Sequence, residues 1–278
     1  MTDPWALAHE AAAVAGVALR PMTSVADAVP IGEVIAATWG EQPVGPEIVR
    51  ALAESGNEPY GAFDGDTLVG FVLGWAGVDR DGLHVHSHML AALPDRRHAG
   101  CGYALKLAQR AHALERGIHV VRWTFDPLIA RNAYFNLAKL GATADRFERA
   151  YYGEMADALN RDDRSDRLTA RWHLDPEPGH AAGSGAPTRS SAPAPAVLER
   201  IGDPERPEPK TTDVHPDADV VSVEVPPEYL ELRARDAGLA TAWRDAVAVA
   251  IEDCIARGLV ATGFARERSA YVFSAESA

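Results

Sequence analysis

One stretch constrains this chain more than any other: a predicted strand, a glycine-containing turn and a long helix follow one another directly. Residues 84–93 are predicted to form a strand that ends at Pro94, and residues 102–115 have the apolar spacing of an amphipathic helix. Gly100 and Gly102 stand where the helix begins. Because glycine has no side chain, the backbone at these two positions can approach a ligand closely.

The start of that helix is suited to an anion. The first turn of a helix leaves amide N–H groups without intrahelical acceptors, and the helix dipole is positive at this end. Arg96 and Arg97 add positive charge just before the turn. The pattern fits neither G-x-x-x-x-G-K-[ST] nor G-x-G-x-x-G, so it predicts a different kind of phosphate-binding turn. The alternative is an ordinary helix start with turn glycines.

Strands and helices alternate around this central unit. The sequence predicts strands at 17–22, 60–63, 67–75, 84–93, 119–125 and 168–174, with a further strand near 151, and helices at 25–39, 46–54, 102–115 and 131–140. A strand, a turn, a helix and a parallel strand imply a right-handed crossover. The expected fold class is therefore α/β with a central mixed sheet flanked by helices.

Composition divides the chain into three parts. Residues 1–174 carry the alternating elements and form the expected first domain. Residues 175–216 are rich in Pro, Gly and Ala, which predicts a flexible linker. Residues 217–278 read as a small extension of strand, helix and hairpin, with strands at 220–225, 259–265 and 270–273 and a helix at 239–257. The extension is too short to fold confidently alone, so we expect it to pack on the first domain or on a partner subunit.

Charge and cysteine usage exclude several classes of function. The net charge of −13 argues against a nucleic-acid partner, because phosphate contacts favour a basic surface. The two cysteines, Cys101 and Cys254, lie in unlike contexts, which fits a reduced protein without a disulfide framework. Residues 1–20 have no basic flank before an apolar run, and no stretch is long enough to span a membrane. We therefore expect a cytoplasmic protein with no membrane partner.

The turn also carries a resemblance to a known family. Arg97, Gly100 and Gly102 fill the pattern [QR]-x-x-G-x-[GA], which is similar to motif A of the GNAT superfamily of acyl-CoA N-acyltransferases. Members often have two spaced apolar residues and a proline just before this motif, a spacing that is matched here by Leu90, Ala92 and Pro94. The element order from residue 17 to residue 142 resembles the family as well, including a less characterised bacterial subset of it.

The resemblance implies acetyl-CoA as co-substrate, with no metal expected. It places the pyrophosphate on the turn and the first helical residues, namely Arg97, His98, Ala99, Gly100, Cys101, Gly102 and Tyr103. The main chain of Leu90 and Ala92 would pair with pantetheine, and an N–H near Ala92 would polarise the thioester carbonyl. The asparagine that the family carries on its next helix would fall on Ala130, so Asn132 is the expected substitute as a cofactor residue.

A base must remove the proton of the attacking amine. His84, His86 and His88 alternate along the predicted strand, so all three are expected on one face. A neutral imidazole suits proton transfer near pH 7, and His88 lies closest to the reacting end. Asp126, which follows the next strand, is the second choice. A solvated or hydrogen-bonded sheet face is the alternative for His84 and His86, and metal binding by the triplet is geometrically compatible but unsupported by a carboxylate or cysteine.

The expected general acid departs from the family pattern. The tyrosine that often protonates the leaving thiolate would fall on Leu137, so this role is open. Tyr134 is the expected substitute, with Tyr151 and Tyr152 as alternatives.

The sequence therefore predicts an N-acetyltransferase that moves an acetyl group from acetyl-CoA to a primary amine by direct attack in a ternary complex. The acceptor is expected to be a small molecule or another amine, and a homodimer is compatible with the extension. The alternative function is a non-catalytic acyl-CoA-binding or regulatory module with the same fold. A weaker alternative is an interaction protein assembled through residues 217–278.

Overall fold

The computed structural model describes residues 3–40, 44–93, 100–155, 162–174, 194–215 and 217–275. The chain divides into two compact units. The first comprises residues 1–123 with 173–175, and the second comprises residues 124–172 with 176–278.

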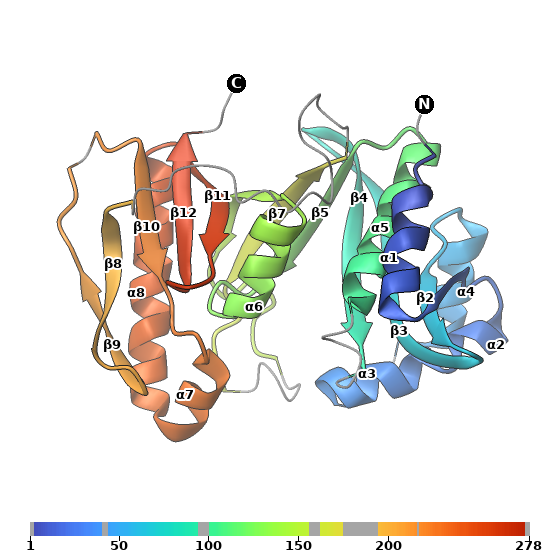
Figure 1. The fold of residues 1–278 in the computed structure, drawn as a ribbon, viewed down its shortest axis with the longest axis horizontal. Coiled ribbons are helices and arrows are strands. Elements are labelled where there is room, and N and C mark those ends of the chain that lie inside the picture. The colour runs from blue at the N-terminus through green and yellow to red at the C-terminus, as the bar shows by residue number, and fades with distance from the viewer. Residues whose placement is uncertain are drawn as a thin grey trace. The chain divides into compact units, whose positions relative to one another are not determined.

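The first unit contains the predicted strand, turn and helix (Figure 1). Its elements are α1 (Ala6–Ala15), β1 (Ala18–Pro21), α2 (Val25–Ala28), α3 (Ile31–Trp39), α4 (Pro46–Glu54), β2 (Tyr60–Asp64), β3 (Thr67–Asp79), β4 (Gly82–Ala92), α5 (Cys101–Glu115) and β5 (Val120–Phe125), of which the last two residues of β5 belong to the second unit. The hairpin of β2 and β3, the strand β4 and the helix α5 confirm the elements that the sequence predicts there.

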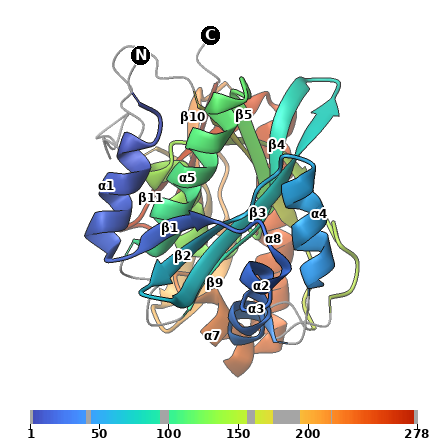
Figure 2. The ribbon, with the colours of Figure 1, turned by 90° about the vertical axis from the view of Figure 1, so that its right-hand side faces the viewer.

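The sheet of this unit is mixed. Its strands lie in the order β1-β2-β3-β4-β5, with antiparallel pairs up to β4 and a parallel pair between β4 and β5. Helices α2, α3 and α4 cover one face and α5 covers the other, as Figure 2 shows. A cluster of buried side chains fills the space under α2–α4, centred on Phe71, Leu73, Ile31 and Ile35. The predicted fold class, a mixed sheet flanked by helices, is confirmed.

The first helical region differs from its prediction in two ways. The expected single helix at 25–39 is split into α2 and α3, and Pro30 stands at the break. Proline has no N–H with which to continue the helical hydrogen-bond ladder. Helix α1, which the sequence analysis did not predict, is rich in alanine, the residue with the highest helix propensity.

The second unit contains the later strands and helices of the chain. Its elements are α6 (Ala130–Ala133), the π-helix η2 (Tyr134–Lys139), β6 (Thr143–Glu148), β7 (Arg167–His173), β8 (Ala196–Asp203), β9 (Arg206–Thr211), β10 (Val220–Glu224), α7 (Tyr229–Arg235), α8 (Ala237–Ala256), β11 (Leu259–Ala265) and β12 (Ala270–Ala275). The strands lie in the order β7-β6-β11-β12-β10-β8-β9, and α8 packs against several of them. Trp243 of α8 is fully buried, and its indole N–H donates to the carbonyl of Pro207 at 2.7 Å.

Part of the predicted linker is a hairpin. Within residues 175–216, strands β8 and β9 pair antiparallel, while residues 175–193 lie outside the described part of the chain. Pro207 and Pro209 suggested a linker, but both stand on β9, which ends the strand order. An edge strand tolerates proline because one row of its N–H groups has no neighbouring strand to bond. The predicted boundaries at 174 and 217 therefore differ from the compact units.

Candidate functional site

The backbone at the start of α5 has the geometry that allows a ligand to approach it closely. Gly100 caps the helix with φ of 90° and ψ of 2°, a left-handed conformation that favours glycine. Gly102 has open space around it: a side chain there would first meet Leu90 Cδ2, at 3.9 Å. The described part of the turn can therefore present main-chain N–H groups to an anion.

The other residues that the sequence predicts to bind the cofactor divide into two groups. Arg97, His98 and Ala99 lie outside the described residues. Cys101 and Tyr103 are in the first turn of α5, together with the two glycines. Cys101 is fully buried and its Sγ lies close to the backbone of β3, which supports its interpretation as a spacer in the turn. Burial raises the pKa of Tyr103.

A β-bulge interrupts β4 at His88. The register pairs Leu73 with Met89 and Gly74 with Ser87, so His88 is the extra residue between them. A bulge shifts the alternation of a strand by one residue and re-aims a side chain, and bulges are common beside active sites. Here the shift places the side chains of Leu90 and Ala92, which follow the bulge, on the α5 face.

His86 and His88 share the opposite face. Their ring centroids are 5.9 Å apart, and each lies 5.0 Å from the ring of Trp75 on β3. Burial lowers the pKa of His88, and burial together with His88, His84 and Lys106 lowers the pKa of His86 to about 4. Both imidazoles are therefore neutral near pH 7, as a proton acceptor must be.

The ladder between β4 and β5 is short. It joins Val85 to Val121 and His86 to Arg122, whereas β4 continues to Ala92. Ser87 and Trp123 are the next residues on the two strands. His88, Leu90 and Ala92, which the sequence predicts to act in catalysis and cofactor binding, lie on β4 beyond this point.

A fully buried lysine, which the sequence analysis did not single out, lies at that point. Lys106 of α5 is 2% exposed, and its ammonium donates to Ser87 Oγ at 3.1 Å and to Gln109 Oε1 at 3.0 Å. The same nitrogen lies 3.7 Å from the centre of the Trp123 ring. Burial lowers the pKa of Lys106 well below its usual range. The sequence offered one signal: a charged residue among the apolar positions of an amphipathic helix.

Asp126, the second-choice base, lies in the second unit and is held by an ion pair. Arg244 of α8 donates to its two carboxylate oxygens at 2.7 and 2.9 Å, and the backbone N–H of Leu128 donates at 2.8 Å. Arg244 also contacts Asp163 through two nitrogens. Both carboxylate oxygens of Asp126 are therefore engaged by Arg244.

The π-helix η2 carries the expected acid. Tyr134 begins η2 and is half-buried, with the guanidinium of Arg266 lying 5.3 Å from its ring centre. Leu137, at the family's tyrosine position, is buried in the same segment. Asn132 is exposed on α6. A π-helix is uncommon and often marks a functional site.

The loop with the alternative tyrosines is tied down by residues that precede β7. Ser165 Oγ donates to the carbonyl of Gly153 at 2.7 Å and accepts from the N–H of Tyr152 at 3.1 Å. Asp166 accepts from the N–H of Ala150 at 3.1 Å. The hydroxyls of Tyr152 and Thr124 are 3.1 Å apart. These contacts fix the loop within the second unit.

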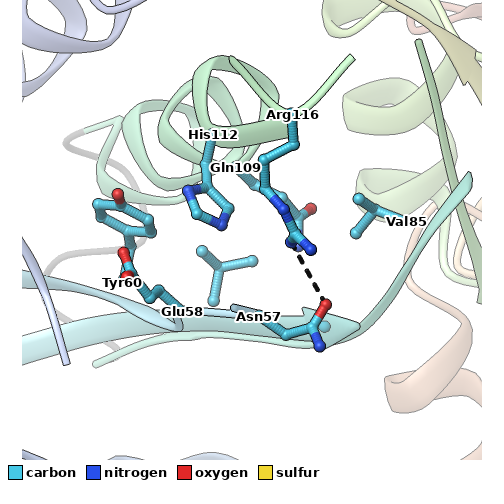
Figure 3. A pocket seen from close by; sticks show the side chains of 9 residues that line it. Asn57, Glu58, Tyr60, Val85, Gln109, His112 and Arg116 are labelled. Atoms are coloured by element: carbon cyan, nitrogen blue, oxygen red, sulfur yellow. Dashed lines mark hydrogen bonds between the residues drawn. The ribbon is translucent and has the colours of Figure 1, made fainter. Parts of the chain in front are cut away.

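A small cavity lies elsewhere in the first unit, between β2–β4 and the later turns of α5 (Figure 3). Its volume of about 20 Å³ is enough for one water molecule. Gln109, His112 and Arg116 line it from α5, and Arg116 contacts Asn57 at 3.5 Å. The cavity is too small for a substrate.

Two further searches concern the described residues alone. Within them, no group of three or more His, Cys, Asp or Glu side chains could hold a metal ion. Among the helices that the structure describes, none is long and apolar enough to cross a membrane.

No family model matches the chain, and no curated protein matches it. Solved structures do match. A Desulfovibrio desulfuricans protein assigned to the GNAT family of acetyltransferases is 18% identical and covers 57% of this chain and 99% of its own, with a TM-score of 0.45. A Salmonella typhimurium protein assigned as an acetyltransferase, solved with its cofactor acetyl-CoA, is 18% identical, covers 62% and 99%, and has a TM-score of 0.46. The ribosomal-protein-S18-alanine N-acetyltransferase of Escherichia coli is 14% identical, covers 59% and 98%, and has a TM-score of 0.45.

These matches concern the fold. At such identities and TM-scores they carry no argument about the activity, substrate or assembly of this chain. Its own element order, the parallel pair of β4 and β5 and the glycine cap of α5 give it the mixed sheet flanked by helices that the sequence predicts.

Proposed function

We propose that this protein is an N-acetyltransferase that moves an acetyl group from acetyl-CoA to a primary amine by direct attack in a ternary complex. The observation that carries the proposal is the succession of β4, with its bulge at His88, and α5, with its glycine start. The start of α5 offers a binding site for a pyrophosphate, and the strand that precedes it, β4, carries the neutral imidazole of His88. The motif shared with the GNAT superfamily adds acetyl-CoA as the co-substrate.

The start of α5 would hold the pyrophosphate. The N–H groups of the first turn and the helix dipole favour the anion, and Arg97, Arg96 and His98 would add charge. The main chain of Leu90 and Ala92 would run beside the pantetheine arm, and a main-chain N–H there would polarise the thioester carbonyl.

His88 would accept the proton of the amine. Its lowered pKa favours the neutral imidazole near pH 7, so Nδ1 or Nε2 is available as a proton acceptor. Asp126 is the weaker choice, because its two oxygens bond Arg244. The role of Tyr134, which belongs to the second unit, as proton donor to the leaving thiolate stays a prediction from the sequence. The amine attacks the carbonyl carbon, the C–S bond breaks, and the products are an amide and free CoA thiol.

A specific observation favours the second candidate, a non-catalytic acyl-CoA-binding module. Leu137 is buried at the position where the family carries its general acid, and Asp126 is engaged in an ion pair. Under this alternative the protein would bind acetyl-CoA without turnover.

The two candidates are separated by free-thiol release from acetyl-CoA with a panel of aliphatic, aromatic and peptide amines. We expect release with at least one amine, and His88→Gln should lower kcat by about 100-fold or more, because a positioned general base contributes that much. His84→Gln is the matched control, since it removes an imidazole from the same strand at the far side of His86, and its kcat should stay close to the wild-type value.

The pH dependence gives an independent check. Because burial lowers the pKa of His88, kcat/KM should fall on acidification with a midpoint below the ordinary imidazole value of about 6.5, as the imidazole takes up a proton. Acetyl-CoA binding without thiol release would support the binding module instead. Failure to bind acetyl-CoA at all would contradict both candidates.

A further inference from the structure

The buried Lys106 occupies a special place in the first unit. It reaches from α5 to the point where the ladder between β4 and β5 ends, since Ser87 and Trp123 directly follow the last paired residues of the two strands. A lysine is rarely fully buried unless it is paired, because removing its charge from water is costly. The contacts described for its ammonium join three elements: Ser87 on β4, Trp123 on β5 and Gln109 on α5 itself.

The contact with Ser87 bears on the β-bulge. Ser87 is 5% exposed and stands immediately before His88, the extra residue of the bulge. Its hydroxyl accepts from Lys106 on the α5 face, while His88 packs on Trp75 on the other face. Because Lys106 holds Ser87 on the α5 face, the backbone at Ser87 is fixed. This restricts the backbone of the next residue, His88, and with it the direction of the His88 side chain.

Space at the bulge is tight as well. A side chain at Gly74, the partner of Ser87, would collide with the carbonyl of His86 and lie 3.1 Å from Gln109 Nε2. Gln109, which accepts from Lys106, therefore packs directly against the paired strand. The bulge thus has close neighbours on the α5 side at both Ser87 and Gly74.

We infer that Lys106 is a positioning residue: through Ser87 and Trp123 it fixes the bulge of β4 and holds His88 in the orientation that proton transfer needs. This inference rests on the proposed function of His88. It assigns Lys106 no contact with substrate. A displaced base loses rate without losing cofactor affinity, because the phosphate-binding start of α5 is unchanged.

The charge of Lys106 adds a second, electrical effect. Around His86 the structure places His84 and His88 on its own strand, Trp75 on β3, Arg122 opposite on β5, with Asp79 bonded to Arg122, and Lys106 on α5. A cation at Lys106 disfavours a second cation nearby. Its removal should raise the titration midpoint of His86, and movement of the bulge should shift that of His88.

The test compares Lys106→Met with Arg110→Met. Arg110 is a matched control: it is a basic residue of the same helix, 5% exposed, whose guanidinium donates to the carbonyl of Leu174 at 2.8 Å. We expect Lys106→Met to lower kcat by about 10- to 100-fold, the effect of a small misplacement of a catalytic group. Its dissociation constant for acetyl-CoA should stay within about twofold of the wild type. Arg110→Met, compared at equal folded fraction, should leave kcat close to the wild-type value.

Imidazole NMR titration supplies a readout that does not depend on turnover. In Lys106→Met the midpoint of His86 should rise and that of His88 should move, and both should be unchanged in Arg110→Met. Ser87→Ala should reproduce the shift at His88, because it removes the same contact.

The outcomes separate the inference from the function it rests on. Wild-type protein that binds acetyl-CoA but releases no thiol would overturn the proposed function, and the titration of His88 would still decide whether Lys106 positions it. An active wild type with an unchanged His88 midpoint and unchanged kcat in Lys106→Met would overturn the inference alone. Equal losses in Lys106→Met and Arg110→Met would also overturn it, since they would reflect general packing.

Discussion

The two units each bury a basic side chain, and they do so in opposite ways. Lys106 in the first unit and Arg244 in the second are both 2% exposed. The ammonium of Lys106 contacts the uncharged groups of Ser87, Gln109 and Trp123, and burial lowers its pKa. The guanidinium of Arg244 bonds two carboxylates, which hold its charge in place and raise its pKa.

The contacts of Lys106 and Arg244 indicate what each charged side chain can do. A buried ion pair stays charged and mainly fixes the elements that carry it, as Arg244 fixes Asp126 and Asp163 beneath α8. A buried lysine changes its protonation readily and influences neighbouring titratable groups. The permanent charge of Arg244 accordingly stabilises the second unit. The charge of Lys106, which depends on its protonation, lies next to β4, the strand that carries His88.

The largest effect is expected from breaking the ion pair of the second unit. Arg244→Met should lower the free energy of unfolding by up to about 3–5 kcal/mol, because Asp126 and Asp163, whose side chains are 14% and 10% exposed, both lose the buried guanidinium that they share. Urea denaturation measures this value. Arg149→Met is the matched control: its pair with Glu252 joins side chains that are 38% and 43% exposed, and its loss should cost about 0–1 kcal/mol. Equal costs for the two variants would contradict the distinction between buried and exposed pairs.

A smaller effect is expected from the hydroxyl that supports this pair. Tyr229 donates to Asp163 Oδ2 at 2.8 Å, and Tyr229→Phe should cost about 1.5–3 kcal/mol because the acceptor is charged. Tyr271 of the same unit is also buried, but it donates to the neutral carbonyl of Pro127 at 2.7 Å. Tyr271→Phe should therefore cost only about 0.5–1.5 kcal/mol, by the same denaturation measurement. The reverse order would show that Asp163 is not held as a carboxylate.

The third effect is a dependence on pH, and it distinguishes the two cations. The unfolded chain binds a proton at Lys106 with a pKa near 10.4, whereas the folded pKa is lowered, so between the two values the unfolded chain binds more protons. Stability contributed by Lys106 should thus rise with pH towards 10, by at most about 1.4 kcal/mol per pH unit.

Urea denaturation of the wild type and Lys106→Met at pH 7, 8 and 9 checks this slope. The difference between the two proteins should change with pH, because methionine does not titrate. The corresponding difference between the wild type and Arg244→Met should stay constant over this range, since a guanidinium keeps its proton. Parallel curves for Lys106→Met would mean that Lys106 remains charged in the folded protein.

The fold was predictable where one residue type decides the backbone. Gly100 and Gly102 marked the helix start, and the apolar runs of β3, β4 and β5 marked the sheet. Pro30 split a helix that the apolar spacing alone extended from 25 to 39. The hairpin of β8 and β9 was not predicted, because its prolines are acceptable only on an edge strand, and the sequence does not say which strand is at the edge.

The site was predictable to the same depth. The proposed cofactor site depends on main-chain geometry, which Gly100 and Gly102 indicate in the sequence. The face shared by His86 and His88 follows from the alternation of side chains along a strand. The bulge at His88 arises from the pairing of β4 with β3, so it cannot be predicted from the sequence of β4 alone. The ion pair of Asp126 and the contacts of Lys106 depend on partners far along the chain, such as Arg244 at 118 residues' separation, which no local pattern reveals.

The most direct test of the account is calorimetric titration of acetyl-CoA into three proteins. Gly102 and Gly32 are each the second residue of a helix in the first unit, α5 and α3, and each has room for a side chain. Gly102→Glu should abolish acetyl-CoA binding, because it places a carboxylate where the pyrophosphate is proposed to sit. Gly32→Glu puts the same group at the same helical position elsewhere and should leave the affinity within about twofold of the wild type. Undiminished binding by Gly102→Glu would contradict the assignment of the α5 start as the cofactor site.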